Sequence, residues 1–423
     1  MWEKLQRIWT IKDIRNRILF VIGMLIIFRI AAHIPVPGIN TAELKQFLAS
    51  NQILGLLNIF SGGTIENFSI VMLGVGPYIT ASIIFQLLTM VVPALEELQK
   101  EGESGQKKIT MYTRLASVPL AFLQGFGLIK LLSQSQFNIV GDISTWKFSA
   151  ILITVTAGTT FLMWIGELIT EKQVGNGISL LIFAGIVSAL PSMIQNVVVN
   201  YNAADFYTYL LFALIAIVTI IGVVFITEGQ RNIPIQHAKQ IRPGRGGNAS
   251  RSHLPLRVNM AGVIPIIFAV SIILFPTMIA QFFINRADIL GRAAKFVADL
   301  FANQLFYGVL YFLLVLGFTF FYTTIVFKPE KIAENLQRQG GFIPGIRPGK
   351  QTEEYLTRTM NKLVLFGALF LAVIAVLPLI LKAVTHSQSL GLGGTSLLIV
   401  VSVAIEITKQ IESQLTMHEY DRA

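Results

Sequence analysis

The chain has 423 residues, of which 53% are hydrophobic and only 13% are charged. A soluble globular domain carries about 25% charged residues, so this composition excludes a soluble protein and indicates a polytopic membrane protein. The net charge is +10, and the absence of cysteine excludes disulfides and thiolate metal sites.

Ten apolar runs are each long enough for a membrane span of about 20 residues. They begin near Ile18, Val75, Tyr112, Phe148, Ile178, Tyr209, Asn259, Leu305, Leu363 and Gly393. The segment before the first run, 1–17, combines basic side chains with aromatic and aliphatic ones at helical spacing, which predicts a helix on the inner membrane surface. The first run lacks a convincing cleavage site at its end and is predicted to stay as the first helix.

A glycine-rich, half-polar stretch leads into the second run and ends at Gly74, Gly76 and Pro77. Irregular backbone at membrane depth is tolerated only where protein or a water-filled cavity satisfies its polar groups. The stretch therefore predicts a broken helix that enters an aqueous interior.

The second half of the chain repeats features of the first. Gly262 and Pro265 open the seventh run as Gly76 and Pro77 open the second, and the fifth and tenth runs begin G-I-S-L-L-I and G-T-S-L-L-I. We expect an all-α fold of two inverted five-helix halves, 18–200 and 201–410, with the functional site where they meet.

Lys and Arg concentrate in alternate connections, which predicts that both termini are cytoplasmic, including the tail 411–423. Two of these basic connections, 228–258 and 328–362, are longer than joining two spans requires. Their Pro and Gly content favours fixed turns at a docking surface over a packed domain. The basic charge is either the topology signal alone or a surface for acidic lipid, a ribosome or an acidic partner.

No enzyme site can be assembled from the sequence. G-I-R-P-G-K-Q-T, from Gly345, has the wrong spacing for a phosphate loop and no preceding strand, so no nucleotide binding is expected. A secondary transporter with inverted repeats would need mid-depth charges, but Arg29, Glu167, Glu228 and Glu406 fall toward span ends, where they are expected to be interfacial anchors. A docking scaffold without a pore leaves the broken second helix unexplained.

Isoleucines at mid-depth are either ordinary core residues or a narrow ring that closes a pore by excluding water. They lie on the four helices that the repeat pairs: Ile79, Ile83, Ile182, Ile186, Ile267 and Ile399.

Six motifs resemble the SecY family, the central channel subunit of the bacterial protein translocase, over essentially the whole chain. They are G-P-Y-I-T-A-S-I-I-F-Q-L-L, G-N-G-I-S-L-L-I-F-A-G-I, N-M-A-G-V-I-P, S-I-I-L-F-P, P-G-I-R-P-G-K-Q-T and G-G-T-S-L-L-I-V-V. The resemblance implies an hourglass pore that passes unfolded secretory polypeptides and releases transmembrane segments sideways into lipid.

The resemblance also assigns site residues by motif position, with the six isoleucines as the pore ring. It places a plug at about 61–72, which includes Ser61, Gly62, Gly63, Thr64, Ile65, Glu66, Asn67 and Phe68. A lateral gate between the second and third helices on one side and the seventh and eighth on the other includes Thr80, Thr89, Gln124 and Phe275. Docking residues for a motor or ribosome are Arg242, Arg245, Arg347 and Lys350.

The implied partners follow from the absence of a nucleotide site. Energy would come from a SecA motor ATPase or a ribosome, SecE-like and SecG-like subunits would hold the halves together, and secretory preproteins with signal sequences would be the substrates in the plasma membrane. No cofactor is expected.

Overall fold

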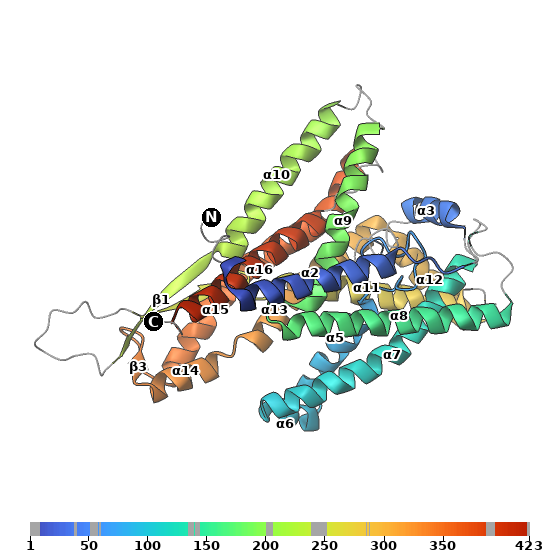
Figure 1. Ribbon diagram of the computed structural model, residues 1–423. Coiled ribbons are helices and arrows are strands. Elements are labelled where there is room, and N and C mark those ends of the chain that lie inside the picture. The colour runs from blue at the N-terminus through green and yellow to red at the C-terminus, as the bar shows by residue number, and fades with distance from the viewer. Residues whose placement is uncertain are drawn as a thin grey trace, which may run out of the picture.

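The protein is described from a computed structural model, in which residues 9–37, 40–50, 58, 61–133, 139, 144–199, 206–237, 252–284, 286, 288–385 and 394–420 are placed. Long helices make up most of these residues and run roughly side by side through the molecule (Figure 1). Residues 1–8 of the predicted surface helix at 1–17 lie outside the described residues, and α2 already begins at Lys12.

The first half contains seven described helices. They are α2 (Lys12–Ala32), α3 (Thr41–Ser50), α5 (Gly76–Val91), α6 (Pro93–Lys100), α7 (Glu103–Ser133), α8 (Thr145–Glu171) and α9 (Gly177–Val199). Asn40 caps α3, because its side-chain oxygen accepts from the Ala42 amide. Asn176 does the same for α9, with the amides of Ile178 and Ser179 as donors.

The second half contains seven helices and three short strands. They are α10 (Phe206–Glu228), β1 (Gln230–His237), β2 (Ser252–Arg257), α11 (Ile264–Phe283), α12 (Ile289–Ala302), α13 (Gln304–Val326), α14 (Pro329–Arg338), β3 (Gly341–Phe342), α15 (Lys350–Thr385) and α16 (Gly394–Tyr420).

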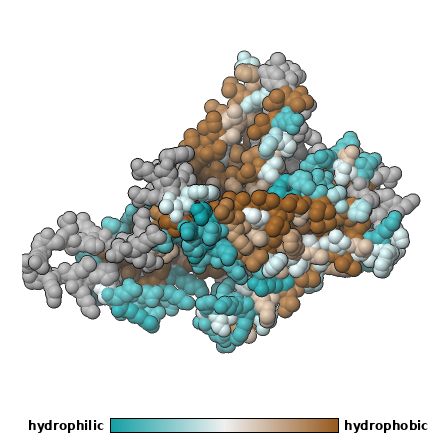
Figure 2. All heavy atoms as spheres, in the orientation of Figure 1, coloured by the Kyte–Doolittle hydropathy of each residue, from teal (hydrophilic) through white to brown (hydrophobic). Residues whose placement is uncertain are grey.

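Each of the ten predicted spans coincides with a helix: α2, α5, α7, α8, α9, α10, α11, α13, α15 and α16. Within the described residues, five helices are long and apolar enough to cross a membrane, or six if the bent pair α5 and α6 forms one span. Hydrophobic side chains cover most of the visible faces of α2 and α10, and hydrophilic ones gather over α14 and α6 (Figure 2). The molecule is therefore an all-α polytopic membrane fold with one small sheet. The inverted relation of its halves stays a prediction.

The charged segment from Glu96 is helical. It forms α6 and the start of α7, and α6 bends 99° away from α5. The bend follows from Pro93, whose ring disfavours helical backbone at the preceding residue, and Val92 is indeed extended. Glu96 accepts a hydrogen bond from Lys100, which lowers the pKa of the Glu96 carboxyl.

The two long basic connections join in one small packed unit, so the expectation of fixed turns without a packed domain is wrong. β1 pairs antiparallel with β2 and, at its far end, with β3, in the order β2-β1-β3. A separate core lies beneath the strands, made of Ile233, Leu256, Ile343 and Leu356. We call the end of the molecule that carries this sheet the sheet end.

Both ends of the described chain lie near the sheet end (Figure 1). Lys172 lies over the ring of Phe20, near the start of α2. On α16, Gln414 donates to the Gln173 carbonyl at 2.5 Å and Lys409 pairs with Glu228 at the end of α10.

The two halves meet along two lines of helix packing. α11 packs against α5 and α7 on one side, and α16 packs against α9 and α2 on the other. A single large hydrophobic cluster crosses both contacts and draws residues from both halves. The predicted site between the halves is therefore the centre of the molecule.

Candidate functional site

The six predicted ring isoleucines all lie in the cluster that joins the halves. They come from α5, α9, α11 and α16, and each is at least 92% buried. Aliphatic side chains from four helices are therefore buried together in one cluster. A cluster of this kind is held by non-directional apolar contacts that can part and close again.

The predicted plug is a compact run of turns, and no described part of it is helical. Gly62, Gly63 and Phe68 adopt positive φ angles of 79°, 75° and 44°. Glycine reaches this region without strain, whereas Phe68 does so as a fully buried residue. A tightly coiled segment of this length can close an opening without extending through it.

Apolar plug residues pack against the first half of the chain. Ile65, Phe68 and Met72 are fully buried in a second cluster with residues of α3, α7 and α8. Behind the plug, Val71 and Val75 belong to the same cluster as the ring isoleucines. The plug is thus packed onto the first half and continuous with the closed ring.

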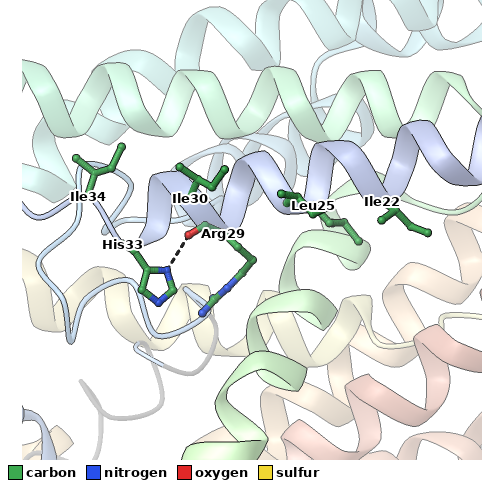
Figure 3. A pocket seen from close by; sticks show the side chains of 7 residues that line it. Ile22, Leu25, Arg29, Ile30, His33 and Ile34 are labelled. Carbon is green, nitrogen blue, oxygen red and sulfur yellow. Dashed lines mark hydrogen bonds between the residues drawn. The ribbon is translucent and has the colours of Figure 1, made fainter.

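Polar contacts fix the plug to its surroundings. The Arg29 guanidinium, on α2, donates to the Gly62 carbonyl at 2.9 Å. Arg29 also borders an open apolar groove of about 660 Å³ along α2, and its side chain extends away from that helix (Figure 3). At the opposite side of the plug, Glu66 pairs with Lys45 of α3 at 3.1 Å. Arg29, which was expected to be an interfacial anchor, thus also has a specific partner in the plug.

The plug backbone touches α9 at a pair of glycines. A Cβ added at Gly185 would lie 2.3 Å from Cα of Gly62, and one added at Gly62 would lie 2.8 Å from Cα of Gly185. Contacts this short are not tolerated, so the approach depends on glycine at both positions. Since Gly185 directly precedes Ile186, the plug rests on the helix that supplies two ring residues.

The predicted lateral-gate residues lie on three helices that pack together, α5, α7 and α11. Gln124 of α7 donates to the Thr80 hydroxyl of α5 at 3.4 Å, and buried Thr89 donates to the Gln86 carbonyl. Phe275 lies half-buried on α11. The structure brings Thr80 and Gln124 together and places Phe275 on the opposing helix.

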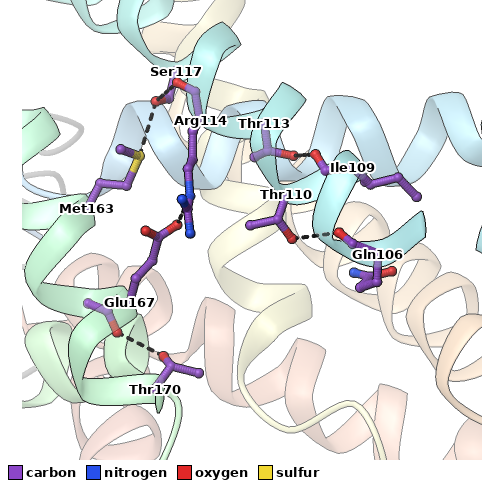
Figure 4. A network of polar contacts seen from close by, with 10 residues as sticks. Gln106, Ile109, Thr110, Thr113, Arg114, Ser117, Met163, Glu167 and Thr170 are labelled. Carbon is purple, nitrogen blue, oxygen red and sulfur yellow. Dashed lines mark hydrogen bonds and ion pairs between the residues drawn. The ribbon is translucent and has the colours of Figure 1, made fainter. Parts of the chain in front are cut away.

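Two further charged residues that were expected to be interfacial anchors have partners. Glu167 of α8 is mostly buried and accepts from Arg114 of α7 at 2.5 Å, within a series of polar contacts along these helices (Figure 4). Glu228 pairs with Lys409. No sequence spacing links these partners, because each pair joins two helices that meet only in the folded chain.

Predicted docking residues are partly described. Arg347 and Lys350 are exposed on the turn between β3 and α15, whereas Arg242 and Arg245 lie outside the described residues. Thr352 is 2% exposed and donates from its hydroxyl to the Arg347 carbonyl at 2.9 Å. Gly345 and Gly349, at positive φ, complete the turn. Sequence reasoning missed Thr352, since a threonine in a basic loop carries no distinguishing signal.

Replacing Thr352 with valine is expected to loosen this turn while leaving the helices intact. The side chain keeps its shape, but one hydrogen bond is lost, which costs about 1 kcal/mol. Amide exchange in 346–352 should accelerate about fivefold. Thr357→Val removes a hydroxyl bond to the Glu353 carbonyl within α15 and serves as the control. Equal exchange in both variants would contradict the assigned role of Thr352.

In the described part of the chain, no group of three His, Asp or Glu residues is placed so that it could hold a metal ion.

Comparisons with known proteins agree with this arrangement. The model of the SecY family matches residues 69–408. The protein translocase subunit SecY of Halalkalibacterium halodurans is 42% identical over 431 residues, covering 99% of each chain.

Two solved structures share the fold at lower identity. One, described as a SecY protein whose plug domain stabilises the closed state of the translocation channel, gives a TM-score of 0.60 at 17% identity, covering 93% of this chain and 91% of the other. The other, Sec61 in the canine ribosome-channel complex from the endoplasmic reticulum, gives 0.57 at 17% identity with the same coverage. Likeness at this identity establishes the fold, and the family match and the relative establish more: the chain belongs to the SecY family of protein translocase subunits.

Proposed function

We propose that this chain is the protein-conducting channel of a plasma-membrane translocase. It passes unfolded secretory polypeptides across the membrane and releases transmembrane segments sideways into lipid. The observation that carries the proposal is the stack at the centre of the molecule, where six isoleucines from both halves form one buried cluster beneath a coiled plug. Membership in a family of translocase subunits, which are not enzymes, supports the same function over a secondary transporter.

The ring suits a channel that accepts many sequences. Aliphatic side chains attract any extended chain through non-directional contacts and exclude water around it. They form no specific hydrogen bonds, so passage does not depend on the order of residues. When the ring is empty, the same side chains pack on one another and the plug covers them.

Lateral release requires the contact between α5, α7 and α11 to part. The Gln124 to Thr80 hydrogen bond joins α5 to α7 on one side of this contact, whereas the cluster that spans the two halves is apolar, so moving α11 away from α5 and α7 exposes mainly apolar surface to lipid. An apolar segment in the channel gains about 0.3–0.6 kcal/mol for each Leu, Ile, Phe or Val that enters the membrane. Partitioning of this kind selects transmembrane segments without a dedicated binding site.

The sheet end faces the cytoplasm in this proposal, with both termini on that side. The exposed Arg347 and Lys350 then face a SecA motor or a ribosome, and Arg242 and Arg245, outside the described residues, add basic charge to the connection between β1 and β2. The canine relative, which comes from a ribosome-channel complex, supports a ribosome as one partner. SecE-like and SecG-like subunits would hold the two halves together, and the energy comes from these partners.

The test is ATP-driven export of a signal-bearing preprotein into vesicles that hold this chain, its small subunits and SecA. Arg347→Glu should reduce export by more than tenfold, because losing a charge-assisted contact and placing a like charge opposite an acidic partner each cost several kcal/mol. Lys331→Glu, an equal charge change on exposed α14, should keep export within about twofold. If the unaltered chain supports no export, the channel proposal fails. If both variants export equally, the docking assignment fails.

A further inference from the structure

A polar pocket lies between the halves at the sheet end, away from the plug. It has a volume of about 530 Å³ and is lined from the first half by Ser179 of α9 and from the second by Arg257, Asn259, Tyr322, Ser402 and Glu406. This volume falls within the range of small-ligand sites, about 300–1,000 Å³. Because both halves contribute walls, the pocket changes shape when they move.

Asn259 is the unusual residue in the pocket. Its side chain is 93% buried, yet neither its amide nitrogen nor its amide oxygen has a hydrogen-bond partner among the described residues. The Ser402 hydroxyl, on the facing helix, is 95% buried and equally unpartnered. Buried polar atoms are nearly always paired, and leaving them unpaired costs stability. Two such residues in the wall of one pocket indicate a ligand that pairs with them.

Charge in the pocket is nearly balanced, which bears on the class of ligand. Arg257 and Glu406 line it together, and Lys409 at its edge is already paired with Glu228 at 2.9 Å. A free phosphate or carboxylate would meet Glu406 as well as Arg257. A neutral ligand that both donates and accepts hydrogen bonds fits this set, since a side-chain amide offers two donors and one acceptor side by side.

We propose that this pocket binds the peptide backbone of an extended chain, with Asn259 pairing to one peptide group through its amide nitrogen and oxygen. A peptide group presents one N–H and one C=O in every residue but proline, so the contact is independent of sequence. The inference rests on the proposed channel function and adds to it a polar holding site ahead of the apolar ring. The Ser402 hydroxyl supplies a second hydrogen bond.

The absence of cysteine from the chain allows a direct test. Ser413→Cys, on the exposed rim of the pocket, is crosslinked to single cysteines placed along a preprotein arrested in reconstituted vesicles. The disulfide yield should not depend on which side chains flank the cysteine in the preprotein. It should fall where the preprotein places prolines in the pocket, because proline has no N–H to donate. In the same background Asn259→Leu and Ser402→Ala should each lower the yield about two- to tenfold per lost hydrogen bond.

A thermal unfolding measurement separates binding from a structural role. Because Asn259 is unpartnered when the pocket is empty, Asn259→Leu should leave the unfolding midpoint unchanged or raise it. Loss of crosslinking together with lower stability would assign Asn259 a structural role and overturn the proposal. If arrested intermediates form normally but their disulfide yield does not change with Asn259→Leu, with Ser402→Ala or with proline at the pocket, the proposed binding site is wrong while the channel function stands. Failure of the unaltered chain to form any intermediate would overturn the channel function and the pocket together.

Discussion

Gly185→Ala is expected to make the resting protein leak ions. The new Cβ would lie 2.3 Å from Cα of Gly62, and the obstructing atom belongs to backbone, so no side-chain rotation can relieve the clash. Overpacking of this kind costs about 1–3 kcal/mol, which the plug can avoid only by leaving its seat. The open population should then rise about 5- to 150-fold.

Ion flux into sealed vesicles holding the protein without a preprotein measures this effect. Gly23→Ala, on α2, is the matched control because a Cβ at Gly23 meets nothing within 4 Å. The control should leak no more than the unaltered protein. If ion flux through the Gly185→Ala variant equals that of the unaltered protein, the plug does not close the channel in the position described.

Sequence patterns were sufficient for the ten long helices, because these depend on local runs of apolar residues. All ten predicted runs are helices, and all six ring isoleucines are buried together. Predicting the ring also needed the family resemblance, since buried isoleucine alone does not distinguish a gate from an ordinary core.

The sheet was not predicted because proline interrupts both of its longer strands. Pro234 of β1 and Pro255 of β2 normally argue against a strand, as proline cannot donate to a ladder. In the structure, both prolines lie where a missing N–H does not break a ladder. β3 pairs with β1 only at Gln236 and His237, so Pro234 lies where β1 has a neighbour on one side alone, and β2 is itself an edge strand.

Arg29→Leu is the second substitution expected to have a large effect. It removes the guanidinium donor to the Gly62 carbonyl, and hydrogen bonds to charged groups contribute about 1.5–3 kcal/mol. We expect resting ion flux to rise about 10- to 150-fold and export to depend less on the signal sequence, because the plug is already partly displaced.

Lys45→Met provides the comparison for Arg29. It removes the ion pair with Glu66, whose side chains are 54% and 41% exposed, and exposed pairs contribute only about 0–1 kcal/mol. Its flux should stay within about fivefold of the unaltered protein.

Combining Arg29→Leu with Gly185→Ala should give less than the sum of the two effects, since both act through Gly62. Full additivity would mean that the two residues hold the plug independently.

The small sheet also forms a mechanical linkage. The Arg347 turn directly follows β3, β3 pairs with β1, and β1 pairs with β2. From β2 the Val258 amide bonds to the Gly229 carbonyl, and the chain enters α11 six residues later, at Ile264. A push on the exposed turn is thereby delivered to the foot of the helix that closes the contact between the halves. In the proposed channel, a motor bound at the exposed turn would therefore act on α11 through the strands without reaching into the membrane.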